Sequence, residues 1–516
     1  MIHKVKTISN IWLEWYEITV ESDSNKSLPT IEIVWLPDNS IKESKERIKA
    51  TFRSCWIELP ARKIILNLSP SDIKKIWTRF DLPMAIAILL LSFDWKITNA
   101  WLINDWLFFW ELWLDWNVKA INWILPSVLY AKNLWYKNFF VPYENLYELK
   151  YIKWINIYPV WNFSELVDYF CNWKEAYFIE WWNNFHEIVN TIDNLENDFS
   201  NISWHSFAKR ALMVAASWLH NVLLLGAPWS WKTMLCKATQ TILPPMNFDD
   251  ILQVSQIYSV IWKLNKENPL ITNRQFRSVH HTSSRVSIVW WWNYLHPWEI
   301  SLAHKWILFF DELAEFPRNV LEVLRQPIED KVINISRASW TVSYPADFMF
   351  MASMNPCKCW YYKDLEKNCI CSINEIKKYQ SKVSWPLLDR FDIILEIPRQ
   401  NINKIISKRN EKTSYEIRKQ VENAWNIQSK RFVWMDISSN SEMSSRHINE
   451  LIHLDSNSKN LLENASKSLS LSPRVIHRIM KLSRTIADLD WSEEIKQEHL
   501  SESLQYRSKN MFVDND

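Results

Sequence analysis

One short stretch of the sequence holds residues whose types and spacing suit phosphate chemistry. An apolar run, Val222 to Leu225, precedes an eight-residue turn that ends in a Lys-Thr pair, and helix-forming residues follow. Strand, turn, Lys-Thr and helix are the parts of a phosphate-binding loop, G-x-x-x-x-G-K-[ST], whose backbone N–H groups surround phosphates. The pattern predicts nucleotide binding by Gly226, Ala227, Pro228, Trp229, Ser230, Trp231, Lys232 and Thr233.

Two residues of this turn do not fit that chemistry. Trp231 stands at the second obligatory glycine, and Trp229 stands at a further small position. An indole at either place would fill the phosphate site, and the backbone there needs φ values that only glycine adopts at little cost. Either the loop is inactive, or these two residues are not tryptophan in the natural protein.

The composition favours the second explanation. The sequence has 1 Gly and 34 Trp, whereas ordinary usage of about 7% predicts roughly 36 Gly in a chain of this length. We therefore predict that most Trp positions are glycines, encoded by UGA in a lineage that reads this codon as glycine. Trp425 is an expected exception, because it falls in the middle of a helical pattern where glycine is unfavourable.

Further polar side chains follow two other apolar runs. Ile307 to Phe310 is followed directly by Asp311-Glu312, and Phe348 to Met354 is followed by Asn355. This pattern predicts that Asp311 holds Mg²⁺ and that Glu312 polarises the attacking water. Asn355 would lie at a strand tip between these two motifs and orient that water.

Four of the seven cysteines form two close pairs, Cys357-Lys-Cys359 and Cys369-Ile-Cys371. Four thiolates in two pairs suit a tetrahedral Zn²⁺ ion. The C-x-C spacing is less diagnostic than C-x-x-C, so reduced free thiols remain the alternative. In a reducing compartment, a zinc site or free thiols are expected of these cysteines rather than disulfides.

Length and charge limit the class of protein. A chain of 516 residues is long enough for two to four domains. Its net charge of +2 means that any contact with nucleic acid must come from local basic patches. The first twenty residues lack the apolar core of a secretory signal, and the apolar segment from Met84 to Phe93 is too short to span a bilayer. We expect a cytoplasmic protein without membrane contact.

Composition and patterning divide the chain into three predicted domains. Residues 1–190 mix strands and helices, and the polar, acidic stretch from Glu187 to Ser203 reads as a linker. Residues 191–400 contain the phosphate-binding loop and the two strands with polar ends, and they read as an α/β nucleotide-binding core. Residues 401–516 read as helical, with an amphipathic helix that opens near Arg474.

Six motifs in a fixed order resemble the Mg-chelatase-like AAA+ ATPases of the ComM/YifB type. They are F-R-S-x-H-H at 276–281 (with Gln275 where the family has Pro), W-E-I-S-L-A-H at 298–304, F-D-E-L at 310–313, M-N-P at 354–356, P-L-L-D-R-F-D at 386–392 and R-T-I-A-D-L-D at 484–490. The resemblance implies a P-loop AAA+ core that binds ATP and Mg²⁺, a C-terminal helical lid, and a ring, expected to be a homo-hexamer. It also implies an N-terminal α+β domain like that of Lon protease and the S5 fold. No serine-lysine pair matches the protease positions, so we expect no proteolysis.

The resemblance also assigns roles to individual residues. Lys232 and Thr233 would bind phosphate and Mg²⁺, Asp311 and Glu312 would be the Walker B pair, and Asn355 would be sensor 1. Arg390 would be an arginine finger that reaches the ATP of a neighbouring subunit, and Arg474 would be sensor 2. A salt bridge from Arg390 to Asp389 or Asp392 is the structural alternative.

The sequence leaves three functions open. ComM-type proteins are similar to helicases and are implicated in DNA branch migration during natural transformation, so the resemblance implies a DNA-translocating ATPase. The alternative is an ATPase subunit of the metal-chelatase type that remodels a protein partner. A non-catalytic protein with an inactive loop would require Trp229 and Trp231 to be genuine. The extra domain ahead of the ATPase favours the ComM type, because chelatase subunits of this family lack it.

Overall fold

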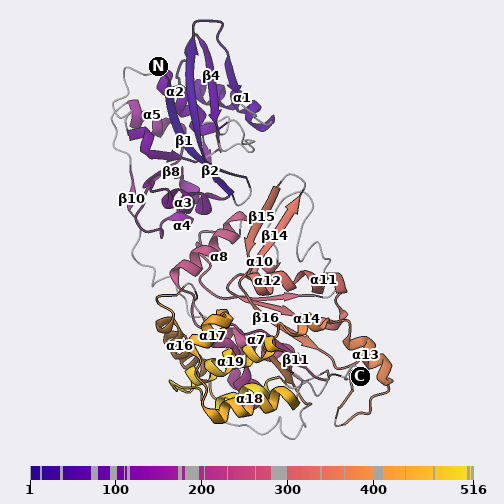
Figure 1. The fold of residues 1–516 in the computed structure, drawn as a ribbon. Coiled ribbons are helices and arrows are strands. Elements are labelled where there is room, and N and C mark those ends of the chain that lie inside the picture. The colour runs from indigo at the N-terminus through magenta and orange to yellow at the C-terminus, as the bar shows by residue number, and fades with distance from the viewer. Residues whose placement is uncertain are drawn as a thin grey trace. The chain divides into compact units, whose positions relative to one another are not determined.

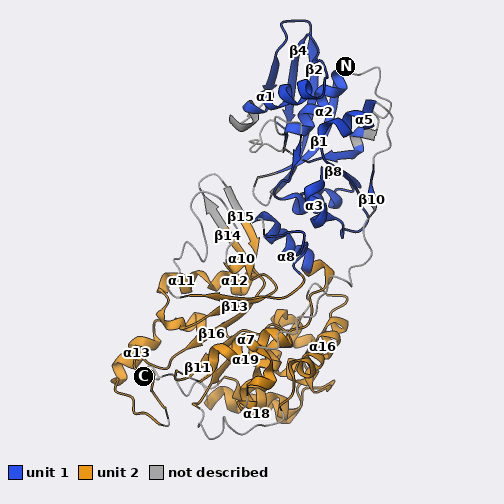
Figure 2. Ribbon diagram, turned by 180° about the vertical axis from the view of Figure 1, so that it is seen from behind, with its two compact units in different colours: residues 1–189, 251–271, 336–342 blue, residues 190–250, 272–335, 343–516 orange. Residues whose placement is uncertain are grey.

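The protein is described here by a computed structural model. It describes residues 2–11, 14–34, 39–70, 80–92, 102–109, 111–112, 117–171, 177–180, 197–202, 204–228, 230–261, 263–280, 299–337, 340–364, 366–399, 411–435, 437, 439–468, 471–507 and 512. The chain forms two compact units, which Figure 2 colours separately. Unit 1 contains residues 1–189, 251–271 and 336–342, and unit 2 contains residues 190–250, 272–335 and 343–516.

Unit 1 is built on a mixed sheet of eight strands in the order β10-β9-β8-β5-β1-β2-β4-β3 (Figure 1). The strands are β1 (His3–Ile11), β2 (Glu14–Asn25), β3 (Ile31–Val34), β4 (Lys63–Ser69), β5 (Trp106–Phe108), β8 (Asn138–Pro142), β9 (Asn156–Val160) and β10 (Ile179–Glu180). β6 (Glu111–Leu112) and β7 (Val118–Lys119) form a separate short pair. In β4, buried side chains alternate with half-buried ones, as expected for a strand with one face on a core.

The helices of unit 1 include one that is buried almost throughout. They are α1 (Asn39–Ser54), α2 (Asp81–Ser92), α3 (Ile124–Asn133), α4 (Leu146–Leu149) and α5 (Phe163–Cys171), with most of α8 (Phe248–Val260). The sequence D-L-P-M-A-I-A-I-L-L-L-S makes α2 apolar on every side, and it packs on β1 and β2. Its one charged residue, Asp81, is fully buried and accepts hydrogen bonds from Arg47 at 2.7 and 3.1 Å. The partner offsets the cost of burying that carboxylate.

Unit 2 is built on a parallel sheet of five strands in the order β12-β13-β16-β11-β17. The strands are β11 (Val222–Leu225), β12 (Phe276–Val279), β13 (Ile307–Phe310), β16 (Met349–Met354) and β17 (Ile393–Glu396). Every residue of β11, β13 and β16 is buried, which explains their continuous apolar sequences. The chain therefore has the mixed α/β architecture and parallel sheet that fit an AAA+ core.

The helices of unit 2 fall into two groups along the chain. Those of the core are α6 (Ser206–Ala216), α7 (Lys232–Ile242), α10 (Glu299–Leu302), α11 (Arg318–Val323), α12 (Arg325–Asp330), α13 (Ile373–Gln380) and α14 (Trp385–Leu388). The C-terminal helices are α16 (Ser414–Arg431), α17 (Ser445–Leu451), α18 (Ser456–Ser468), α19 (Pro473–Leu489) and α20 (Gln497–Gln505). α16 packs against α6 and α7, and α19 packs against α6, so the C-terminal helices share one core cluster with the sheet.

Several expectations from the sequence can be compared with these elements. The strands predicted at Val222–Leu225 and Ile307–Phe310 have those bounds, and β16 lies between them in the sheet, as predicted for the strand that ends at Asn355. Two further strands, β14 (Val332–Arg337) and β15 (Trp340–Pro345), form a separate two-stranded sheet. The linker expected near 187–203 falls mostly outside the described residues. Among the described residues, no helix is long and apolar enough to cross a membrane.

Candidate functional site

The turn after β11 has the backbone shape of a phosphate-binding loop. Residue 231 caps the N-terminus of α7 with φ 60° and ψ 16°, which is left-handed backbone that favours glycine. Gly226 lies so close to β17 that a Cβ there would stand 2.4 Å from the carbonyl oxygen of Ile397. Its N–H donates to the carbonyl of Met354 at 3.2 Å, which ties the turn to the end of β16. Trp229 lies outside the described residues.

Lys232 points back into this turn. Its ammonium donates to the carbonyls of Gly226 and Ala227 at 2.6 and 2.9 Å, and to Asn355 Oδ1 at 3.1 Å. Burial lowers the pKa of Lys232 to about 8, although the carboxylates of Asp311 and Glu312 act in the opposite direction. A phosphate group beside this ammonium would supply the negative charge that its buried position lacks.

The end of β13 brings two acidic side chains to the same place. Thr233 Oγ1 donates to Asp311 Oδ2 at 3.1 Å. The backbone N–H of Glu312 donates to Asp311 Oδ1 at 3.1 Å, and Glu312 has φ 55°, an uncommon conformation for a residue with a side chain. Such backbone strain is concentrated at functional sites.

Ser353 in β16 completes this arrangement, and it was not among the residues predicted from the sequence. Its hydroxyl donates to Asp311 Oδ1, and it accepts the N–H of Glu312 at 3.3 Å. It therefore fixes both acidic residues from the neighbouring strand. The available signal was one polar residue in the otherwise apolar run M-F-M-A-S-M.

These groups surround a single cavity of about 390 Å³. Its lining consists of Pro228, Ser230, Trp231, Lys232, Thr233, Met234, Asp311, Glu312, Ser353, Asn355 and Trp360. The cavity joins a cation and a helix N-terminus, which suit phosphates, to a hydroxyl and a carboxylate, which suit Mg²⁺. The indole of Trp231 is the member that does not fit, since it occupies the wall on which a phosphate would lie.

Tryptophan is concentrated at backbone positions that favour glycine. Among the described residues, 14 non-glycine residues have positive φ, and 8 of them are Trp, far above its share of 34 in 516. They are Trp56, Trp123, Trp135, Trp154, Trp204, Trp231, Trp360 and Trp491. Several are also exposed, with Trp56 at 94% and Trp135 at 88%. Both features are expected of glycine positions and are unusual for the largest apolar side chain.

Trp425 behaves differently. It lies inside α16, its Nε1 donates to the carbonyl of Ala216 at 3.1 Å, and the guanidinium of Arg274 lies 5.4 Å from its ring centroid. The indole makes contacts that a glycine at this position could not make. This environment supports a genuine tryptophan at residue 425.

The two predicted arginines lie away from this cavity. The Arg390 side chain is buried and donates to the carbonyl of Arg325 at 3.2 Å and to Glu329 Oε2 at 2.5 Å. Arg474 is half-exposed, forms an ion pair with the same Glu329, and lines a different cavity of about 840 Å³. Asp392, an expected alternative partner of Arg390, is paired instead with Arg478 at 2.6 Å. The finger role of Arg390 and the sensor 2 role of Arg474 stay predictions, because each concerns an ATP-bound arrangement of the protein.

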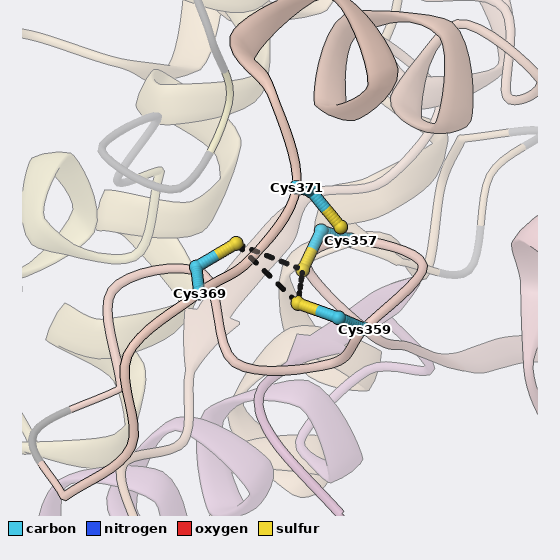
Figure 3. A group of neighbouring side chains, drawn as sticks. All are labelled: Cys357, Cys359, Cys369 and Cys371. Carbon is cyan, nitrogen blue, oxygen red and sulfur yellow. Dashed lines mark hydrogen bonds between the residues drawn. The ribbon is translucent and has the colours of Figure 1, made fainter.

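The four clustered cysteines, all in the segment between β16 and α13, come together in space (Figure 3). Their sulfur atoms all lie within 4.8 Å of one another, with Cys357 buried and Cys359, Cys369 and Cys371 half-buried. Burial opposes ionisation of Cys359, but hydrogen bonds from the backbone N–H groups of Tyr361 and Ile370 lower its thiol pKa to about 6. The sequence prediction that these four side chains form one group is confirmed, and the group is compatible with zinc.

Comparison with known proteins agrees with this geometry. Family models match at residues 198–405 (Magnesium chelatase, subunit ChlI), 20–145 (Subunit ChlI of Mg-chelatase) and 411–507 (Magnesium chelatase, subunit ChlI C-terminal). The competence protein ComM of Haemophilus influenzae is 33% identical over 494 residues, which cover 95% of this chain and 94% of that protein. The uncharacterized proteins YifB of Salmonella typhimurium and Escherichia coli are 31% and 32% identical, with the same coverage. The chain therefore belongs to the Mg-chelatase-like family of ComM and YifB.

Proposed function

We propose that this protein is an ATP-hydrolysing AAA+ motor of the ComM type, which works as a ring on branched or single-stranded DNA. The observation that carries the proposal is the convergence of Lys232, Thr233, Asp311, Glu312 and Asn355 on one cavity, from the ends of two adjacent strands and a helix N-terminus. A phosphate cradle beside paired carboxylates is the minimum needed for nucleotide hydrolysis.

Each side chain has a distinct part in the proposed reaction. Lys232 exchanges its contacts with Gly226 and Ala227 for the phosphates of ATP, and its charge neutralises theirs. Thr233 and Asp311 would hold Mg²⁺, which supplies positive charge to the phosphates when bound. Glu312 accepts a proton from the attacking water, and Asn355, freed from Lys232, orients that water.

The remaining parts of the proposal concern the assembly. The C-terminal helices would act as the lid, and the N-terminal domain would have the Lon-like or S5-like fold. Arg390 would reach the ATP of a neighbouring subunit in a hexamer, which requires that it leave Glu329. Arg474 would approach the phosphates from the lid as sensor 2, and a cytoplasmic location is expected.

DNA is favoured as the substrate because a relative named for competence matches 95% of this chain. The alternative, an ATPase subunit that remodels a protein partner, is supported by the three family models, whose descriptions all name magnesium chelatase. The two alternatives share the ATP site and differ in whether DNA or a protein stimulates ATP hydrolysis. The ligand that raises the hydrolysis rate therefore distinguishes the DNA motor from the protein-remodelling ATPase.

The decisive experiment uses a gene in which UGA codons are replaced by glycine codons. ATP hydrolysis by the full chain is measured alone, with a four-way DNA junction, and with duplex DNA of the same length. We expect hydrolysis that the junction stimulates. Hydrolysis that no DNA changes would favour the protein-remodelling alternative, and its complete absence from a folded, ring-forming protein would refute the motor.

Substitutions in the Walker B pair test the assignment of the site. Glu312→Gln should still bind ATP but hydrolyse it at least about 100-fold more slowly, because the proton acceptor is lost. Lys232→Ala should weaken binding itself. Glu315→Gln, which alters a nearby exposed carboxylate paired with Lys382, serves as the control and should leave turnover unchanged. Parental turnover by Glu312→Gln would show that another group accepts the proton.

A further inference from the structure

The cysteine cluster has the geometry of a metal site and not of a disulfide. The Sγ atoms of Cys357 and Cys359 are 3.3 Å apart, those of Cys359 and Cys369 are 3.4 Å apart, and those of Cys357 and Cys369 are 3.8 Å apart. A disulfide needs about 2.05 Å. Four sulfurs arranged tetrahedrally around one Zn²⁺, at about 2.3 Å each, lie about 3.8 Å from one another. The cluster therefore needs only small side-chain shifts to enclose a single ion.

Backbone groups around the cluster support the same conclusion. The N–H groups of Tyr361 and Ile370 point at the sulfur of Cys359, and that of Tyr362 points at the sulfur of Cys357. Residue 360, with φ 76°, turns the chain so that the next two amides face back toward the sulfurs. Amides aimed at thiolates stabilise negative charge that a bound cation then neutralises.

The chemistry of the ligands selects the ion. Four thiolates in a tetrahedron are typical of zinc or iron–sulfur sites. Sulfurs that all lie within 4.8 Å of one another leave room for one ion and not for a cluster of several irons. Zinc needs no redox partner and closes a four-cysteine site completely, so it is the better fit.

The same loop also forms part of the ATP cavity. Asn355 and residue 360 both line that cavity, and they flank the first cysteine pair in the sequence. The N–H of residue 360 donates to the carbonyl of Cys357 at 3.1 Å. On the other side, Gln380 of α13 donates to the carbonyl of Pro356 at 2.9 Å. Asn355, which lines the pocket, is therefore only two residues from the metal ligand Cys357.

We propose that Cys357, Cys359, Cys369 and Cys371 bind one Zn²⁺ ion, and that this ion holds Asn355 in place against ATP. The second half of the proposal rests on the proposed ATPase function. The ion joins the first pair, which follows β16, to the second pair, which immediately precedes the capped N-terminus of α13 at Ser372. Without it, the loop between these two elements loses its cross-link, and the wall of the ATP cavity loses its support.

The test compares two double variants of the full chain, produced with glycine at the UGA codons. Cys369→Ser with Cys371→Ser removes the pair that is remote from the ATP cavity and leaves Asn355 and its neighbours unchanged. Cys55→Ser with Cys171→Ser changes two cysteines outside the cluster and is the matched control. Zinc content is measured by elemental analysis, and affinity for a fluorescent ATP analogue by titration.

We expect about one zinc per chain in the parental protein and the control, and none in the cluster variant. The cluster variant should bind the analogue at least about five-fold more weakly, within the range of ordinary coupling between sites. Replacement of zinc by Co²⁺ should give the visible absorption of tetrahedral thiolate coordination. Should the cluster variant fail to fold, removal of zinc from the folded parental protein with a chelator, followed by zinc addition, gives the same comparison.

Each half of the proposal can fail separately. Parental protein that is produced with ample zinc and still contains no metal would overturn the metal site. Full zinc in the parental protein with unchanged nucleotide affinity after its removal would overturn the coupling. A zinc-loaded protein that binds no nucleotide would refute the ATPase and the coupling together, while its zinc content would still support the metal site.

Discussion

At the scale of single residues, the left-handed backbone at residue 231 does not suit the tryptophan that the sequence has there. The chain adopts left-handed backbone at the start of α7, and an indole placed there lines the cavity that a phosphate would need. The same disagreement recurs at residue 360, the other Trp on the wall of this cavity. Glycine at both positions removes the conflict without any change in the path of the chain.

The codon prediction follows from this disagreement. Trp229, Trp231 and Trp360 should be encoded by UGA, and peptides of the native protein should have the mass of glycine at these positions. Trp425 should be encoded by UGG, because its indole has a hydrogen-bond partner. Gene sequencing and peptide mass spectrometry check both statements. UGG codons at 229 and 231 would remove the basis for an active site.

A pH prediction follows from the environment of Lys232. Burial lowers its pKa to about 8 in the nucleotide-free protein, and the phosphates of ATP raise it again. Above pH 8 the protein must therefore take up a proton when ATP binds. Affinity should fall by up to about ten-fold per pH unit above pH 8 until the pKa of the complex is reached, with little change from this group below pH 8.

Titration of Mg·ATP from about pH 7 to 9.5, in buffers of different ionisation enthalpy, measures this proton uptake. Glu315→Gln should keep the parental profile, since its carboxylate does not line the cavity. An affinity that is constant across the range would mean that Lys232 is fully protonated before ATP arrives.

At the scale of elements, the sheet of unit 2 leaves no space beside the start of the turn. β11 pairs with β17 along its whole length, and Gly226 follows while the carbonyl of Ile397 stands against it. Gly226→Ala should push the turn away from β17. We expect a loss of about 1–3 kcal/mol of stability, as for other overpacked sites, together with weaker ATP binding.

Thermal unfolding and nucleotide titration check this prediction. Ala227→Ser, at the next residue of the turn, is a useful comparison because Ala227 already carries a Cβ. An unchanged melting temperature for Gly226→Ala would mean that β17 can move aside.

The elements of the site could largely be predicted from the sequence, because each depends on local information. Four apolar residues followed by Asp311-Glu312 identify a buried parallel strand with functional groups at its end. Contacts between distant residues could not be predicted in this way. The pairing of Arg390 with Glu329 and the support of Asp311 by Ser353 depend on how the elements pack, and spacing carries no such information.

At the scale of the whole molecule, one carboxylate pairs with both the predicted arginine finger and the predicted sensor 2 arginine. Glu329 pairs with Arg390 and with Arg474. An arginine that acts on a neighbour's ATP must leave this partner when the ring forms. Arg390→Ala should leave ATP affinity nearly unchanged and lower hydrolysis by about 10³-fold or more.

Mixing of inactive subunits gives the sharper test of the ring. Rings that contain both Arg390→Ala and Lys232→Ala subunits should recover activity, because some interfaces combine an intact loop with an intact arginine. Arg446→Ala, which removes an exposed arginine of α17 that is paired with Glu450, should behave as the parental protein does. If mixed rings form and stay inactive, Arg390 acts within its own subunit.

The UGA codons that we predict at the left-handed Trp positions would also prevent other cells from using this gene. A ribosome that reads UGA as a stop codon would release the chain no later than residue 229, before Lys232 and every catalytic group that follows it. A ribosome that reads UGA as tryptophan would complete the chain and place an indole on the wall of its ATP site. If this prediction holds, a foreign host that acquired the gene would obtain either a fragment or a full-length chain whose proposed ATP site is blocked.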